Sequence, residues 1–233
     1  LVRWYLALGL PLLDAYGQTE AAGIICFVRP ARMRLGTVGQ AMPGIELSIS
    51  PVGEVLVRGS TVFAGYLNQP ELTQAALADG WLHTGDVGAL DADGFLRITD
   101  RLKDIIVTAG GKNVAPSEIE NSLKCSPYIA DAIVVGDRRK YLTALVLIDH
   151  ENVAQYAQAQ RIPYTDFTSL CRAREVVSLI EREISAVNRD LARVETVKKF
   201  RILEQLLTPE DDEMTPTMKM KRKLIGSRYA DLI

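Results

Sequence analysis

The stretch Asp100–Asn121, "DRLKDIIVTAGGKNVAPSEIEN", separates two different kinds of sequence. Before it, from about residue 36 to 100, short β-rich runs alternate with Gly, Pro and Asp turns, which is typical of a small antiparallel barrel or sandwich. After it, strand-like and helix-like runs alternate over roughly 130 residues, the size of an independent domain. The sequence therefore predicts an α+β chain with two domains, residues 1–100 and 101–233, and a boundary at 101–103.

Hydrophobic periodicity and turn residues also predict the individual elements. Strands are expected at "IELSIS", "GEVLVRG", "GFLRITD", "DIIV", "IADAIVVG", "YLTALVLID" and "VKKFRIL". Helices are expected at "VRWYLAL", at "NQPELTQAAL" with Asn68 as its cap, at "APSEIENSLKC", and from about Ser169 to Leu191.

Composition excludes several classes of protein. The 233 residues are 48% apolar and 24% charged with a net charge of −2, so nothing draws the whole chain toward nucleic acid. Cys26, Cys125 and Cys171 form no CxxC spacing, which argues against a zinc site or disulfide framework and favours a reducing, cytoplasmic setting. The apolar run from Trp4 to Leu13 is about half of the roughly 20 residues that a membrane span needs. The chain starts without Met in mid-pattern, so we expect a fragment of a longer protein.

The heptapeptide Asp14–Glu20, "DAYGQTE", combines groups that suit a nucleotide. Gly17 permits a tight loop, and the ring of Tyr16 can lie against a purine. The hydroxyl of Thr19 can donate to a phosphate, and the carboxylate of Glu20 can hold Mg²⁺ beside it. The alternative is an ordinary strand end with polar loop residues.

Two further motifs carry chemistry more weakly. In "GWLHTGD", Asp86 after a glycine turn can accept hydrogen bonds from ribose hydroxyls, while His83 is expected to have a packed structural role. In "DRLKDIIVTAGGKN", Arg101 can reach a ribose or phosphate, and Gly110 and Gly111 would let a ligand approach the backbone closely. A surface hairpin with charged flanks is the alternative for this second stretch.

The polar stretch "TPEDDEMTPTMKMKRK" is expected to form a solvated loop near the end of the chain, because acidic residues precede its basic run. A single lysine reaching into a binding site is the alternative, and position alone does not select which lysine.

Taken in order, these motifs resemble the adenylate-forming superfamily of acyl-CoA synthetases, firefly-type luciferases and peptide-synthetase adenylation domains. "DAYGQTE" is similar to its Y-G-x-T-E motif, "FAGYLNQPELT" to G-Y-x-x-x-P-x-x-T, and "WLHTGD" to the ribose-binding T-G-D. "DRLKD" through "VAPSEIE" resembles the hinge and the loop after it, and "TPTMKMKR" resembles the terminal lysine motif. The resemblance spans essentially the whole chain, and "YGQTE" is most similar to the long-chain fatty acyl-CoA synthetase branch.

The resemblance implies the fold and the reaction. Residues 1–100 would be the remnant of the large domain, with a β-barrel subdomain at about 36–100, and residues 101–233 the mobile small domain. The reaction would be ATP-dependent ligation of a long-chain fatty acid to CoA, with Mg²⁺, through an acyl-adenylate. The alternatives are a fatty acyl-AMP ligase that loads a carrier protein and a non-catalytic module that binds nucleotide or acyl-CoA. The expected partners are small-molecule substrates without nucleic acid, in the cytoplasm, with peripheral membrane contact of the full-length protein as a variant.

The resemblance also implies a role for each site residue. Asp14 would lie at the adenine edge and Tyr16 would stack on adenine beside Gly17; Thr19 would contact phosphate and Glu20 would bind Mg²⁺. Asp86 and Arg101 would hold the ribose, Lys103 would be the hinge residue, Gly110, Gly111 and Lys112 would line the pantetheine path, and Lys219 would be the catalytic lysine.

Three departures from the family pattern matter. Met218 replaces the usual glycine of T-x-x-G-K-x-x-R, and "VTAGGKN" is one residue longer than the commoner loop. Nothing in the 233 residues resembles the family's Ser/Thr- and Gly-rich phosphate loop. The fragment alone is therefore expected to be inactive.

Overall fold

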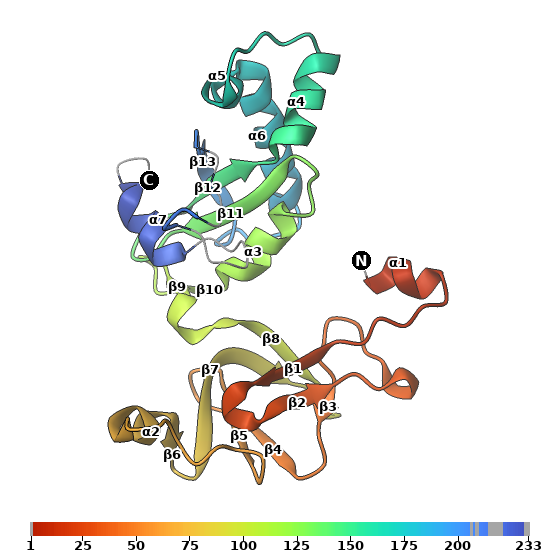
Figure 1. Ribbon diagram of the computed structural model, residues 1–233, viewed down its shortest axis with the longest axis vertical. Coiled ribbons are helices and arrows are strands. Elements are labelled where there is room, and N and C mark those ends of the chain that lie inside the picture. Colours follow the sequence, from red (N-terminus) through yellow and green to blue (C-terminus); the bar gives the residue numbers. More distant parts are fainter. Residues whose placement is uncertain (1, 206, 208–209, 214–220, 231–233) are drawn as a thin grey trace. The chain divides into compact units, whose positions relative to one another are not determined.

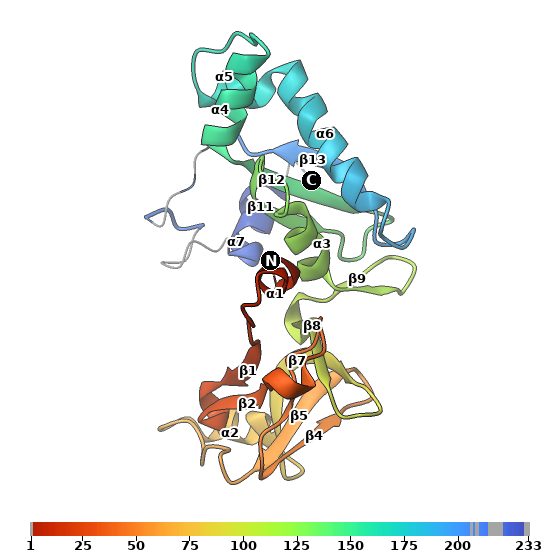
Figure 2. The same cartoon turned by 90° about the vertical axis from the view of Figure 1, so that its right-hand side faces the viewer.

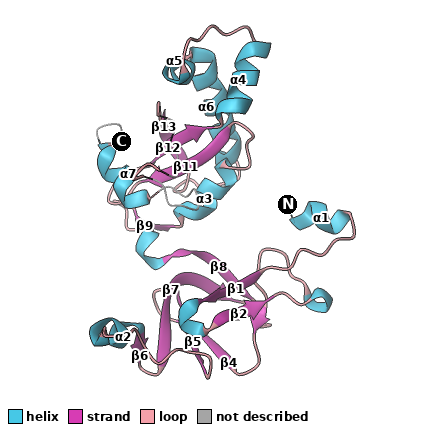
Figure 3. Cartoon of the chain, viewed as in Figure 1, coloured by secondary structure: helices cyan, strands magenta, loops and turns pink. Residues whose placement is uncertain are grey.

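The computed structural model describes residues 2–205, 207, 210–213 and 221–230. It divides into two compact units, Leu1–Lys103 and Asp104–Ile233. The helices and strands of both units are coloured along the sequence in Figure 1 and by type in Figure 3.

The first unit is mostly strands, as Figure 3 shows. Its elements are α1 (Val2–Ala7), β1 (Ala15–Gln18), η1 (Thr19–Ala21), β2 (Gly23–Phe27), η2 (Pro30–Arg32), β3 (Gln40–Ala41), β4 (Ile45–Ile49), β5 (Glu54–Gly59), α2 (Pro70–Ala76), β6 (Leu77–Ala78), β7 (Trp81–Leu90) and β8 (Leu96–Arg101).

These strands form two open sheets. One has the order β1-β2-β3, and the other has the order β4-β5-β7-β6 with β8 also paired to β7. The expected α+β class is confirmed, but no barrel closes among the described residues, because the second sheet ends at β4 and β6 instead of joining them. The apolar core of this unit includes Ile25, Val55, Leu82 and Leu96, which are all at most 1% exposed.

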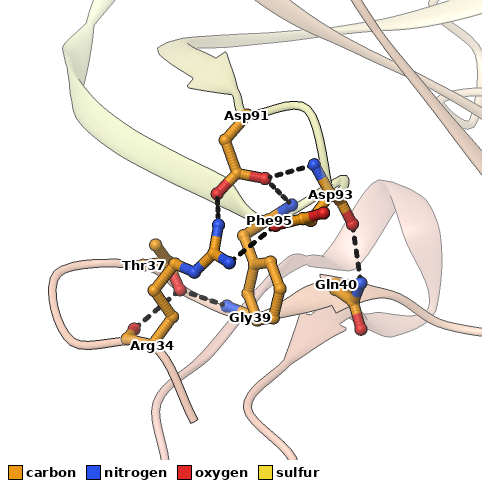
Figure 4. A network of polar contacts seen from close by, with 7 residues as sticks. All are labelled: Arg34, Thr37, Gly39, Gln40, Asp91, Asp93 and Phe95. Atoms are coloured by element: carbon orange, nitrogen blue, oxygen red, sulfur yellow. Dashed lines mark hydrogen bonds and ion pairs between the residues drawn. The ribbon is translucent and has the colours of Figure 1, made fainter. Parts of the chain in front are cut away.

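A polar network joins the turn after β7 to the segment before β3 (Figure 4). Arg34 forms ion pairs with Asp91 and Asp93, and its guanidinium lies 4.3 Å from the ring centroid of Phe95. The Gln40 side chain donates to the Asp93 carbonyl over 2.7 Å. These contacts fix the β7–β8 turn, and with it the strand that carries the T-G-D motif.

The second unit contains a mixed sheet and the longer helices. Its elements are η3 (Leu102–Asp104, which spans the division), β9 (Ile106–Val107), β10 (Asn113–Val114), α3 (Pro116–Leu123), β11 (Ile129–Val135), β12 (Leu142–Ile148), α4 (His150–Ala159), α5 (Phe167–Arg172), α6 (Arg174–Asn188), β13 (Val197–Ile202) and α7 (Arg222–Arg228).

Its central sheet, β11-β12-β13, is covered on both faces. Alternate residues of a strand point to opposite faces, so Ala132 and Val134 join the core beneath α3, α5 and α6, while Ile133 packs with Ile225 of α7 on the other side. Figures 1 and 2 show α6 and α7 on opposite sides of these strands. Strand β12 is buried along its whole length because both faces are covered.

Two predicted details are wrong, and one helix was missed. The helix expected from Ser169 to Leu191 is two helices, because Ala173 has an extended ψ of 128° between them. Helix α4 was not predicted. The N-cap of α2 is Gln69, since Pro70 takes the first helical position and Asn68 lies in the left-handed region with φ of 55°.

Candidate functional site

Three motifs converge on the carboxylate of Asp86. The hydroxyl of Tyr16, from β1, donates to Asp86 Oδ2 over 2.7 Å. Arg101, the last residue of β8, places its Nε 2.7 Å from Asp86 Oδ1, and the two residues are paired across β7 and β8. Asp86 is only 5% exposed, so the ion pair and the hydrogen bond offset the cost of burying its charge.

A β-bulge presents Asp86. The motif lies inside the long strand β7, not in a turn between elements as expected from the sequence. On the neighbouring strand β5, Leu56 pairs with His83 and Glu54 pairs with Val87, so residues 84–86 lie opposite Val55 alone. Such a bulge redirects side chains locally.

The bulge is held by side chains of the same sheet. Gly85 has φ of 70°, which favours glycine, and its N–H donates to Glu54 Oε1 over 2.9 Å. The Thr84 hydroxyl donates to the Val55 carbonyl and accepts from the N–H of Asp86. Glu54 Oε2 lies 2.9 Å from His83 Nδ1, so His83 supports this turn of the backbone.

The Tyr16–Asp86 pair leaves capacity for a ligand. Burial, followed by the hydrogen bond to Asp86, raises the pKa of the Tyr16 phenol well above its usual range, so Tyr16 remains a donor. A carboxylate offers about four lone-pair sites, and Tyr16 and Arg101 each use one. Asp86 can therefore still accept hydrogen bonds from a polyol such as ribose.

Gly17 is required by a close approach of backbones. A Cβ at this position would lie 1.6 Å from the carbonyl oxygen of Gly23 on the paired strand β2. Only glycine therefore fits, and the reason is the neighbouring strand rather than an unusual φ.

Glu20 is held by a tyrosine from a different motif. Its Oε1 accepts a 2.7 Å hydrogen bond from the Tyr66 hydroxyl, and this bond raises the pKa of Tyr66. Oε2 has no protein partner among the residues that the structure describes. Asp14 and Thr19 are exposed, and within the same part of the chain their side chains form no polar contact.

The described residues contain no cluster of three or more His, Cys, Asp or Glu side chains that could hold a metal ion. Glu20, with one oxygen available, fits a Mg²⁺ ion, which commonly takes one or two carboxylates and completes its coordination with phosphates and water.

The expected pantetheine residues lie on the β9–β10 hairpin of the second unit. Gly110, Gly111 and Lys112 are exposed, and Gly111 has φ of 72°. The N–H of Gly111 donates to the Thr108 carbonyl over 2.8 Å, which closes the loop. Lys103 is exposed within η3.

Lys219 lies outside the described residues, but the nearby Arg222 does not. Arg222 Nη2 donates to Glu120 Oε2 over 2.6 Å, and its Nη1 donates to the Val134 carbonyl over 2.9 Å. Glu120 Oε1 accepts from the N–H of Val134 over 2.7 Å. The start of α7 is thereby tied to α3 and β11.

The expectation of a solvated loop is wrong at Glu213, whereas Glu210, Asp212 and Lys221 are exposed as expected. Glu213 is 1% exposed and forms an ion pair with Arg228, and its carbonyl accepts from the N–H of Lys221 over 2.7 Å. Burial of a carboxylate requires such a partner.

Sequence reasoning did not identify the supporting roles of Tyr66 and Glu54 in the first unit or of Glu120 in the second. Tyr66 belongs to the G-Y-x-x-x-P-x-x-T segment, so its motif was a usable signal. Glu54 and Glu120 gave no such signal, because their partners are distant in the sequence.

Comparison with known families decides the affiliation. The AMP-binding enzyme C-terminal domain matches residues 103–233, which is over half of the chain, and the AMP-binding enzyme domain matches residues 1–67. The chain belongs to the AMP-binding enzyme family. The resemblance read from the motifs is thus confirmed.

Relatives within the family are fatty-acid ligases. The chain is 40% identical over 229 residues to the long-chain-fatty-acid–CoA ligase FadD15 of Mycobacterium bovis, covering 98% of this chain and 38% of the relative. It is 34% identical over 256 residues to the long-chain-fatty-acid–CoA ligase ACSBG2 of Gallus gallus, covering 100% of this chain and 34% of the relative. The chain therefore spans little more than a third of the length of these relatives.

Solved structures of AMP-binding enzymes have the same fold. O-succinylbenzoate-CoA synthetase from Bacillus subtilis in complex with ATP and magnesium aligns with a TM-score of 0.69 at 26% identity, covering 95% of this chain and 42% of that one. Its complex with the acyl-adenylate intermediate aligns with a TM-score of 0.72 at 25% identity, covering 96% and 43%. In the described part of our chain, no helix is both long and apolar enough to cross a membrane.

Proposed function

We propose that the protein to which these 233 residues belong is an ATP-dependent long-chain fatty acid–CoA ligase. A carboxylate oxygen of the fatty acid attacks the α-phosphorus of ATP, and the bond to the bridging oxygen breaks to release pyrophosphate. The thiol of CoA then attacks the acyl carbon, loses its proton and displaces AMP. The affiliation with fatty-acid ligases supports this reaction.

One observation carries the proposal at the level of the site: residues from three motifs meet at one carboxylate, with Tyr16 and Arg101 on the two oxygens of Asp86. A buried carboxylate oriented in this way suits the two hydroxyls of a ribose. Tyr16 offers an aromatic face for adenine, with Asp14 at the adenine edge and Thr19 near the phosphates.

Glu20 is the proposed ligand of Mg²⁺, which when bound would neutralise phosphate charge. Gly110, Gly111 and Lys112 are the proposed contacts of pantetheine, because an exposed glycine loop lets a narrow chain approach the backbone. Three free cysteines in the described structure support a reducing, cytoplasmic compartment.

Lys219 is the proposed catalytic lysine. Its positive charge would stabilise the negative charge that develops on the carboxylate and α-phosphate oxygens. In the full-length protein, Lys219→Ala should lower ATP–pyrophosphate exchange by about 100-fold, the scale of losing one preorganised electrostatic contact. Lys221→Ala is the matched control and should leave the exchange rate close to wild type, because no role in the reaction is proposed for it.

Unchanged exchange in Lys219→Ala would remove that residue from the mechanism. The acceptor is tested separately by supplying ATP, Mg²⁺ and a long-chain fatty acid and following loss of the free CoA thiol. CoA consumption is expected. Exchange without consumption of CoA would favour transfer to a carrier protein, and absence of exchange in the wild-type protein would favour a binding module.

A further inference from the structure

The segment Phe63–Thr73, which contains the G-Y-x-x-x-P-x-x-T motif at Gly65–Thr73, contacts Glu20 at two points. The Tyr66 hydroxyl donates to Glu20 Oε1 over 2.7 Å, and the N–H of Phe63 donates to the Glu20 carbonyl over 2.8 Å. Both the side chain and the backbone of Glu20 are therefore held by one segment that lies more than 40 residues further along the chain.

Thr73 holds Tyr66 in place. Its Oγ1 accepts from the N–H of Tyr66 over 2.8 Å and donates to the Gln69 carbonyl over 2.9 Å. Gly65 fits closely against it, because a Cβ at Gly65 would lie 2.5 Å from Thr73 Cγ2. The glycine, tyrosine and threonine of the motif thus form one contact unit, and Pro70 begins the helix that carries the threonine.

Helix α2 contributes no buried residue to the core of its unit. Only Ala76, the last residue of the helix, packs partly buried against that core. The Phe63 ring, edge-on to Tyr66 with centroids 4.8 Å apart, further restricts the phenol. The polar contacts of Thr73 and the ring contact of Phe63 thus hold the Tyr66 hydroxyl on the carboxylate of Glu20.

We propose that Tyr66 is a positioning residue for the Mg²⁺ ligand Glu20, and that Thr73 sets the position of Tyr66. This inference rests on the proposed function. By occupying Oε1, the phenol limits rotation of the carboxylate and leaves Oε2, which would bind Mg²⁺, without a protein partner among the described residues. Partners of metal ligands commonly determine metal affinity in this way.

The test compares ATP affinity with and without the metal in the full-length protein. Calorimetry gives the Kd for ATP in EDTA and in saturating Mg²⁺. The Kd in EDTA divided by the Kd in Mg²⁺ measures how much the metal strengthens ATP binding. Tyr66→Phe, which removes only the hydroxyl, should lower this ratio by about tenfold while the Kd in EDTA stays unchanged. Thr73→Val should lower it in the same direction.

Two controls separate positioning from a general effect. Tyr164→Phe alters a tyrosine that is similarly exposed, 39% against 37% for Tyr66, and should leave the ratio unchanged. Glu20→Gln should lower the ratio at least as much as Tyr66→Phe, and the double variant should match Glu20→Gln alone, because Tyr66 acts only through Glu20.

An unchanged or increased ratio in Tyr66→Phe, with a lowered ratio in Glu20→Gln, would overturn the role of Tyr66 and leave the proposed ligase intact. An unchanged ratio in both variants would overturn the assignment of the metal to Glu20. A Kd in EDTA that is higher for Tyr66→Phe than for the wild type would assign the residue to ATP binding or to folding instead.

Discussion

At the scale of single residues, burial should make the three cysteines differ in their reactivity. Cys26 and Cys171 are at most 2% exposed, and burial raises the pKa of each thiol to about 12, whereas Cys125 is exposed. At about pH 8 the buried thiols should remain protonated, and iodoacetamide should label Cys125 alone, because the thiolate is the nucleophile. Peptide mapping by mass spectrometry checks this.

The control for cysteine labelling is Cys125→Ser, which should abolish the reaction of the native protein. In denaturant all three cysteines should react. Labelling of Cys26 in the native protein would contradict its burial in the core of the first unit.

At the scale of elements, the ion pair that ties α7 to α3 should matter more than a similar pair on the surface. The side chains of Arg222 and Glu120 are 25% and 10% exposed, and Arg222 also reaches the backbone of β11. Arg222→Ala should lower the free energy of unfolding of the second unit by about 2 kcal/mol, because it removes the cation facing a buried carboxylate. Urea denaturation measures this.

Arg172→Ala is the matched control, because Arg172 forms a two-point contact with Glu204 at 2.9 and 2.6 Å in the same unit. Its side chain is 68% exposed, so its loss should change the stability much less. An equal loss of free energy of unfolding in the two variants would show that the ion pair between α7 and α3 stabilises the unit no more than an exposed pair does.

Elements were predictable where one pattern decided them. Strand β12 is apolar except for Thr143, and α3 begins at Pro116 with Glu118 in its first turn, so both appear where the sequence predicts them. The break at Ala173 was not predictable, because it depends on a single ψ inside a helical pattern. The bulge in β7 was missed because it results from pairing with β5, a strand about 30 residues earlier.

At the scale of the whole molecule, the two units divide after Lys103, and this residue is the proposed hinge. Rotation about it would separate adenylation from the transfer of the acyl group to CoA. Lys103→Pro should lock φ there and impair transfer of the acyl group to CoA by about tenfold or more, with a smaller effect on adenylation. ATP–pyrophosphate exchange reports adenylation, and reaction of supplied acyl-adenylate with CoA reports the second step.

Lys103→Ala is the control for the hinge, since it removes the charge but keeps the backbone free, and both steps should then remain close to wild type. Equal loss of both half-reactions in Lys103→Pro would argue against rotation about this residue.

The sequence by itself determined the family, the α+β class and the identity of the residues proposed for ATP, because those depend on motifs of a few adjacent residues. Only the tertiary structure decided that Tyr16 and Arg101 share the carboxylate of Asp86, that Tyr66 holds Glu20, and that the two sheets stay open. These contacts join residues 15 to 70 positions apart, and such pairings are set by strand register and packing, which no local pattern records.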